Sequence, residues 1–294
     1  MSAKGQFVTR LGLALMRALA RWPLPCLRAL GAVLGLLLYV LVGLRRRIAM
    51  VNLGLCFPQW SQARRRAVTI RSFIYLAQSW LDRGWLWHAP ESLLRRRLHL
   101  HGALHEFDGL DPSIVFCPHF YGLDAAATAI NMNIPREFTS IYTPQANRQV
   151  DEWIKAGRLR WGRVQLFQRT DGIKANVAGL RSGQVLYLLP DMDFGPDGSV
   201  FVPFFGVPAA TVPSVPRFAR LGKAKVMAVV PRMTSQGYDI EIMPAWENYP
   251  SGDLQTDTAR GNQLLETLVL SMPAQYYWVH RRFKSRPPGH PPVY

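Results

Sequence analysis

The stretch Ile114-Val115-Phe116-Cys117-Pro118-His119-Phe120-Tyr121-Gly122-Leu123-Asp124 joins an apolar segment to the alanine-rich run 125–130. The apolar segment has the composition of a buried strand, and the alanine-rich run is a good helix-forming sequence. Pro118 and Gly122 interrupt both patterns. The stretch therefore predicts a strand, a turn and a helix in that order, which is one unit of an α/β protein.

Beyond residue 110, short apolar runs alternate with helical segments, and this alternation predicts a layered α/β domain with a mixed β-sheet flanked by helices. Strands are predicted at 113–117, 137–142, 164–168, 184–189, 225–231 and 238–244. Helices are predicted at 122–132, 148–160, 171–182, 214–222 and 256–272. A further helical pattern, with an apolar stripe, covers 59–98.

The opening stretch also places an imidazole and a carboxylate five positions apart, at His119 and Asp124. Five residues of continuous α-helix rotate two side chains about 140° apart. The two groups therefore meet only if His119 lies in the turn and Asp124 in the first helical turn. In that geometry Asp124 accepts a hydrogen bond from one ring nitrogen of His119 and leaves the other as a base. The alternative is a turn histidine near a carboxylate that the helix dipole favours.

The charge of the chain is strongly positive: 35 Lys and Arg residues against 19 Asp and Glu give +16 over 294 residues. Such an excess favours polyanionic partners, namely nucleic acid, anionic lipid head groups or an acidic carrier protein. Arginine triplets at 45–47, 64–66 and 95–97 lie close to the most apolar segment, which is typical of a juxtamembrane surface. We therefore predict binding to anionic membrane lipids and no nucleic acid, for which the sequence has no motif.

Residues 29–44 form an uncharged, leucine-rich run of sixteen, which is shorter than the ~20 residues needed to cross a bilayer core. Four arginines are spaced four to seven positions apart in the apolar sequence before this run, as in a basic amphipathic helix that lies in the membrane interface. They are Arg10, Arg17, Arg21 and Arg28. By the positive-inside tendency, the arginines at 45–47 stay on the cytoplasmic side. A buried core helix is the alternative, and the run does not decide between crossing and embedding.

The predicted organisation has three parts. Residues 1–48 form an amphipathic and hydrophobic membrane anchor, 49–285 the α/β domain, and 286–294 a proline-rich tail that is extended and loosely ordered.

Three cysteines, Cys26, Cys56 and Cys117, are too widely spaced for a disulfide framework or a metal site, and they fit a reducing compartment. No metal is predicted. Cys117, two residues before His119, is interpreted as a small apolar side chain at the end of a buried strand, with a nucleophile as the alternative.

Five blocks of the sequence resemble, in order, those of the lipid A biosynthesis acyltransferases, also called the lauroyl/myristoyl acyltransferases. The blocks are 52–58, 117–124, 189–195, 201–206 and 275–284. A histidine, four residues and an acid are the signature of the wider glycerolipid acyltransferase group. The resemblance covers nearly the whole chain and implies a glycerolipid acyltransferase-like fold with an N-terminal membrane-associating helical region. It also implies that His119 is the general base and that Asp124 orients it.

Further candidate residues follow the predicted strands. The resemblance assigns Arg169 to phosphate binding or charge stabilisation, and a surface salt bridge with Asp171 is the alternative. Asp191 and Asp193 precede Gly195 at a strand end, where open α/β sheets bind ligands. We predict that this loop contacts the substrate and orients Arg169 or a sugar hydroxyl. Metal binding is the weaker alternative, because it needs further oxygen ligands.

Phe204 and Phe205 belong to the aromatic run 201–206. We predict that they form an acyl-chain wall, with core packing as an equal alternative. Because a buried methylene contributes about 0.8 kcal/mol, the length of such a groove would select the length of the chain.

Taken together, the residues and the resemblance predict an O-acyltransferase on the cytoplasmic face of a bacterial inner membrane. It moves a fatty acyl chain from acyl carrier protein, the co-substrate, to a hydroxyl of a lipid A precursor, without a cofactor. The acidic carrier suits the basic surface. One alternative is another lipid acceptor, such as a lysophospholipid or an aminolipid. A second is a basic membrane-binding scaffold without activity, against which the complete pair of histidine and acid argues.

Overall fold

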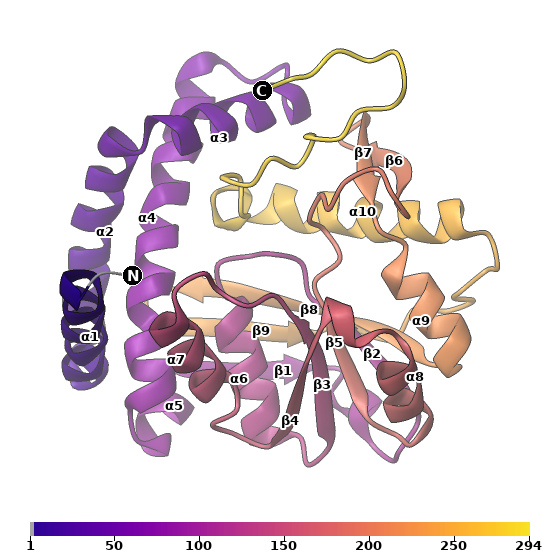
Figure 1. Ribbon diagram of the computed structural model, residues 1–294, viewed down its shortest axis with the longest axis horizontal. Helices are drawn as coiled ribbons and strands as arrows, with labels where there is room; N and C mark the ends of the chain where they lie inside the picture. Colours follow the sequence, from indigo (N-terminus) through magenta and orange to yellow (C-terminus); the bar gives the residue numbers. More distant parts are fainter. Residues whose placement is uncertain (1–2) are drawn as a thin grey trace.

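The computed structural model describes residues 3–294, with the side chains of residues 3, 4 and 169 left out of the description. A seven-stranded sheet in the order β1-β9-β8-β2-β5-β3-β4 forms its centre (Figure 1). Its strands are β1 (Leu98–Gly102), β2 (Ser113–Phe116), β3 (Glu137–Tyr142), β4 (Arg163–Gln168), β5 (Val185–Leu188), β8 (Lys225–Thr234) and β9 (Gly237–Ile242). All neighbours are parallel except β8 and β9. The sheet is therefore mixed, as predicted.

Helices cover both faces of this sheet and one side of the molecule. The N-terminal helices are α1 (Ala3–Ala18), α2 (Leu24–Leu41), α3 (Gly43–Cys56), α4 (Gln62–His88) and α5 (Glu91–Arg97). The remaining helices are α6 (Leu123–Asn133), α7 (Arg148–Arg158), α8 (Lys174–Arg181), α9 (Ser214–Gly222) and α10 (Leu254–Ser271). Figure 1 shows α2 and α4 upright and side by side at one edge of the domain, with α2 outermost.

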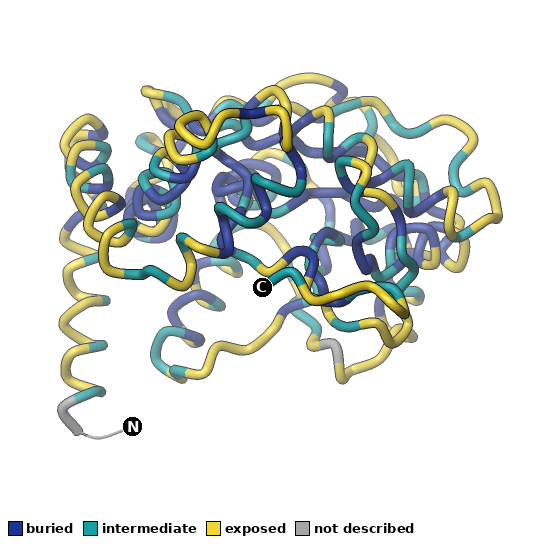
Figure 2. The backbone as a smooth tube through the Cα atoms, turned by 90° about the horizontal axis from the view of Figure 1, so that it is seen from above, coloured by how far each residue is buried: buried dark blue, intermediate teal, exposed yellow. Residues whose placement is uncertain are grey.

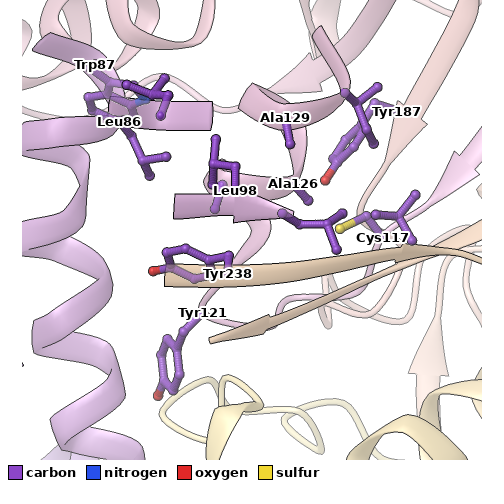
Figure 3. Packing of buried hydrophobic residues seen from close by; sticks show 14 of the residues in the cluster. Leu86, Trp87, Leu98, Cys117, Tyr121, Ala126, Ala129, Tyr187 and Tyr238 are labelled. Atoms are coloured by element: carbon purple, nitrogen blue, oxygen red, sulfur yellow. The ribbon is translucent and has the colours of Figure 1, made fainter. Parts of the chain in front are cut away.

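Alternation along the central strands divides the core into two layers. In β2, Val115 packs with the α4 and α6 side, whereas Ile114 and Phe116 pack with α8 and α9. Figure 3 shows the first layer, in which Cys117 and Tyr187 lie near Ala126 of α6. Side chains alternate across a strand, and core layers cover both faces of β2. All four residues of β2 are therefore buried.

The strands and helices predicted beyond residue 110 are confirmed to within a few residues. The predicted helix over 59–98 is two helices, because Ala89 and Pro90 have extended backbone between the end of α4 at His88 and the start of α5 at Glu91. The sequence analysis missed the edge strand β1 and the hairpin of β6 (Val200–Phe204) and β7 (Val207–Thr211). The prolines inside that hairpin argue against strands, and the two-stranded sheet tolerates them because it lies apart from the main one.

The C-terminal tail, residues 286–294, ends against the N-terminal helix α3. Residues 286–294 have no helix or strand, as expected for an extended tail. The expected loose ordering is wrong at its end, because the Tyr294 hydroxyl donates to Asn52 Oδ1 of α3 and accepts from the backbone N–H of Phe283 at 3.1 Å. Figure 1 shows the tail crossing the top of the molecule from the sheet side to α3.

Candidate active site

His119 lies in the loop between β2 and α6, at the carboxyl end of a central parallel strand. The loop continues the pairing with β5, since the Cys117 N–H donates to Leu188 O at 2.9 Å. The C-terminal segment fixes its other side, where the Tyr277 N–H donates to the His119 carbonyl at 3.0 Å. The His119 side chain keeps 21% of its surface exposed. The imidazole is therefore held in place and still open to a substrate.

The partner of the His119 ring is Asp191, on the loop that follows β5. Its Oδ1 lies 2.7 Å from His119 Nδ1, and its Oδ2 accepts from the His119 backbone N–H at 3.0 Å. Since β2 and β5 are parallel neighbours, both loops leave the same edge of the sheet. Burial raises the pKa of Asp191, but the charge and hydrogen bonds of His119, with Arg282, lower it overall. The ionised carboxylate thus places the ring proton on Nδ1 and leaves Nε2 as the acceptor.

Asp124 has different partners from those predicted. One carboxylate oxygen binds Arg83 of α4, with Nε and Nη2 each at 2.8 Å, and the other binds Arg158 of α7, with Nε and Nη2 each at 3.0 Å. Burial raises the pKa of Asp124, and the charges of Arg158 and Arg83 lower it overall. The predicted hydrogen bond from His119 to Asp124 is therefore wrong. As the second residue of α6, Asp124 points to α4 and α7, while His119 turns toward β5.

Asp193 holds its loop to the C-terminal segment. Its carboxylate accepts from the Ser285 N–H at 2.7 Å, the Ser285 hydroxyl at 2.8 Å and the Gly195 N–H at 2.9 Å. Gly195 has a φ of 111°, which favours glycine. The prediction that Asp193 orients Arg169 or a sugar is not supported by these contacts, because both of its oxygens already bind groups of its own loop and of Ser285.

His280 accepts a hydrogen bond at Nε2 from the Asp193 N–H, at 3.0 Å. Burial lowers the pKa of His280 to about 4. This imidazole is neutral and occupied, so it fixes the Asp193 loop and does not replace His119 as a base.

Arg169 begins the short 3-10 turn Arg169–Asp171 after β4, at the same sheet edge as His119. The Asp171 carboxylate accepts from the Gln168 N–H at 2.7 Å within that turn. The predicted phosphate-binding role of Arg169 stays a prediction. No group of three or more metal-ligating side chains occurs in the part of the chain that the structure describes.

Phe204 and Phe205 pack in a further core cluster, formed by α3, α10 and the C-terminal segment. Phe204 has no exposed surface and lies between Tyr276 and Phe283. Phe205 packs on Phe57, with ring centroids 4.6 Å apart. The prediction that Phe204 forms an acyl-chain wall is wrong, because a ring without exposed surface lines no open groove. Core packing, the alternative, is what the structure has.

An apolar cavity of about 330 Å³ lies elsewhere, at the carboxyl ends of β3 and β5 and against α8 and α9. Leu189 and Pro190, the two residues before Asp191, line it together with Phe194 and Phe218. Asn176 also lines it, and its buried Oδ1 has no hydrogen-bond partner among the described residues. This cavity could not be predicted, because its walls come from parts of the chain between Ile141 and Leu221 that are far apart in sequence. The only local signal was the apolar run that leads into Asp191.

Arg282 was not predicted as a site residue, although it lies close to the candidate site. Its side chain is buried and donates to the Ala210 carbonyl and to Thr211 Oγ1, both at 2.8 Å. It therefore joins β7 to the C-terminal segment, and its charge helps to keep Asp191 ionised.

Fold and site together define a class: an α/β protein with a partly exposed histidine hydrogen-bonded to a buried carboxylate at the ends of parallel strands. Residues 1–285 match the family of bacterial lipid A biosynthesis acyltransferases. The chain is 32% identical to the lipid A biosynthesis lauroyltransferase of Escherichia coli K12, covering 98% of this chain and 95% of that protein. It is 30% identical to the palmitoleoyltransferase of the same organism, over 98% and 94%. The myristoyltransferase is 29% identical over 83% and 76%.

The chain belongs to the bacterial lipid A biosynthesis acyltransferase family.

Proposed function

We propose that this protein transfers a fatty acyl chain from the thioester of acyl carrier protein to a hydroxyl of a lipid A precursor, on the cytoplasmic face of the inner membrane. The observation that carries the proposal is the His119–Asp191 pair, with Nδ1 and Oδ1 2.7 Å apart and the ring partly exposed. Family membership supplies the acyl transfer and the acceptor class. We also infer that the mixed sheet is of the glycerolipid acyltransferase-like type.

The proposed reaction needs one base and no acyl-enzyme. His119 Nε2 removes the proton from the acceptor hydroxyl while the oxygen of that hydroxyl forms a bond to the thioester carbonyl carbon. The C–S bond then breaks, and His119 returns the proton to the departing thiolate. Asp191 keeps the proton of the other ring nitrogen in place and stabilises the imidazolium between the two transfers. General base catalysis of this kind contributes roughly 10²- to 10⁴-fold.

Asp124 takes a positioning role in this proposal. Its two arginines join α4, α6 and α7 around the start of the helix that follows His119. The spacing of the motif then serves two separate functions, with the base in the loop and a buried acid that fixes the helix behind it.

The apolar cavity is our candidate for the acyl-chain site in place of Phe204 and Phe205. Its wall at Leu189 and Pro190 leads directly to Asp191, so a chain in the cavity would have its thioester end near the base. Each buried methylene contributes about 0.8 kcal/mol, which makes the volume of the cavity a measure for chain length. Arg169 is proposed to bind a phosphate of either substrate.

The test is transfer from an acyl carrier protein thioester to a purified lipid A precursor in detergent micelles, with the ester product identified by mass spectrometry. His119→Ala should lower kcat at least 10²-fold. His290→Ala, in the exposed tail, is the control and should leave kcat unchanged. Near-normal turnover of His119→Ala contradicts the assignment of the base. Acylation of only a lysophospholipid or an aminolipid keeps the chemistry and contradicts the acceptor.

A further inference from the structure

The apolar helix α2 is packed along one face onto α4. The buried residues on this face are Leu24, Leu27, Gly31 and Gly35, spaced three or four positions apart. A Cβ on Gly35 would come within 2.5 Å of the Ile74 Cα atom, and one on Gly31 within 3.0 Å of the Gln78 Cα atom. The two helices therefore touch backbone to backbone, which only glycine allows.

A buried ionic network reinforces this contact. Arg28 of α2 binds Asp82 of α4 at 2.5 Å, and Asp82 also accepts from the Tyr238 hydroxyl of β9 at 2.6 Å and from the Trp85 indole at 2.8 Å. Asp82 has no exposed surface. Separating α2 from the domain would leave this carboxylate buried without its cation, at high energetic cost.

Both ends of α2 are also attached to the same domain. Before its start, the Trp22 carbonyl accepts a hydrogen bond from Arg97 of α5 at 2.9 Å. Further upstream, Thr9 Oγ1 of α1 accepts one at 3.0 Å from Asn147, the residue that caps α7. After its end, Arg45 of α3 donates to the Val279 carbonyl at 3.0 Å. A helix that crosses a bilayer has its two ends on opposite sides, whereas these two ends rest on one body.

The outer face of α2 is apolar and has no partner among the described residues. Its most exposed side chains follow one helical stripe, Val33, Leu36, Leu37, Val40 and Leu41, and the exposed Leu44 follows at the start of α3. On α1 the exposed Phe7, Leu11 and Leu15 form a second stripe, and Figure 2 shows that helix exposed along most of its length. Exposed arginines border both stripes, among them Arg10, Arg17, Arg45 and Arg47. Apolar stripes with a cationic border fit the surface of an anionic bilayer.

We propose that α1 and α2 form an in-plane anchor: α2 stays docked on α4, lays its outer stripe into one leaflet, and leaves both of its ends on the cytoplasmic side. Among residues 3–294, α2 is the helix long and apolar enough to span a membrane, and only 22% of its 18 residues are buried in the molecule. The anchor rests on the membrane location in the proposed function, and it removes the crossing alternative.

The decisive experiment places one epitope tag at the N-terminus and another at the C-terminus of the full-length protein, and tests both with protease in sealed inside-out and right-side-out inner-membrane vesicles. An in-plane anchor exposes both tags in the inside-out vesicles only. Cleavage of the N-terminal tag from the opposite side overturns the proposal. Absence of the protein from the membrane fraction overturns both the anchor and the membrane location, whereas acyl transfer in detergent tests the chemistry separately.

Two substitutions test the contacts themselves. Leu37→Glu with Leu41→Glu on the outer stripe should lower co-flotation with phosphatidylethanolamine/phosphatidylglycerol vesicles at least tenfold without changing the melting temperature. Leu110→Glu, equally exposed but outside the anchor, is the control. Gly35→Leu should lower the melting temperature, whereas Gly12→Leu, where a Cβ meets nothing within 4 Å, should not. Unchanged flotation of the double variant, or an unchanged melting temperature of Gly35→Leu, contradicts the proposal.

Discussion

His119 is fixed by groups from two distant parts of the chain. Asp191 binds its ring and its backbone N–H, and the Tyr277 N–H binds its carbonyl. The place of His119 in a turn between a strand and a helix could be predicted from sequence, because the histidine and its turn are local features. Its partner could not, because Asp191 lies 72 positions away and is brought near only by the pairing of β2 with β5. The local acid, Asp124, was the wrong choice because two arginines from other helices bind it.

Replacing Asp191 separates its role from that of a structural carboxylate. Asp191→Asn keeps the size of the side chain but removes the charge that stabilises the His119 imidazolium. We expect kcat to fall by about 10²- to 10⁴-fold, with an altered pH profile of kcat/KM. Asp193→Asn is the matched control, which should lower the melting temperature and keep the shape of the profile. The same pH profile for Asp191→Asn and the native protein contradicts the role of Asp191.

Among the elements, those with a clear period were predicted and those shaped by tertiary contacts were not. The strand β3 and the helix α9 match their predicted bounds, because their apolar runs are short and end at turn residues. The hairpin of β6 and β7 escaped prediction, since its prolines oppose strands and its support comes from distant parts of the chain, α10 and Arg282. For the same reason the sequence could not decide whether its aromatic residues line a groove or pack in the core.

The junction of α4, α6 and α7 predicts loss of stability in acid. Burial raises the pKa of Asp124 in the folded protein, but the charges and hydrogen bonds of Arg158 and Arg83 lower it overall below its ordinary value. Its stabilising contribution is complete above the unfolded pKa and is lost as the pH falls through the lower folded pKa. We expect the urea concentration at the unfolding midpoint to decrease when the pH is lowered below about 4. At pH 7, Asp124→Ala should lower the free energy of unfolding by about 3–5 kcal/mol. An unchanged midpoint for Asp124→Ala at pH 7 contradicts this role.

The cavity between α8 and α9 predicts a change in chain selection. Ser214, the first residue of α9, lines the cavity. Ser214→Phe reduces its volume and should shift kcat/KM toward shorter acyl chains, measured with carrier thioesters of several lengths. Leu159→Phe, an exposed position outside the cavity, is the control. If both variants keep the native order of preference, the acyl chain binds elsewhere.

On the scale of the whole molecule, the two ends of the sequence meet. Tyr294 joins the tail to Asn52 of α3, and Asn52 in turn donates to the Trp278 and His280 carbonyls at 2.7 Å. The helical layer and the loops of the candidate active site thus share one set of hydrogen bonds. The sequence contains no local sign of it, because the contact spans 242 positions.

Removal of the Tyr294 hydroxyl tests this closure. Tyr294→Phe loses two hydrogen bonds and should lower the free energy of unfolding by about 1–2 kcal/mol, measured by urea denaturation. His290→Ala in the same tail should have no effect. Equal stability of Tyr294→Phe and the native protein shows that the tail end is not fixed to α3.

Cys26 is the exposed cysteine available for labelling, because the other two thiols are buried. Cys56 and Cys117 are buried, and burial raises the pKa of both, in the case of Cys117 to about 12. Cys26 is exposed near the start of α2. A maleimide fluorophore should therefore attach there alone, so the depth of this helix in a lipid film becomes measurable by quenching without any engineered residue.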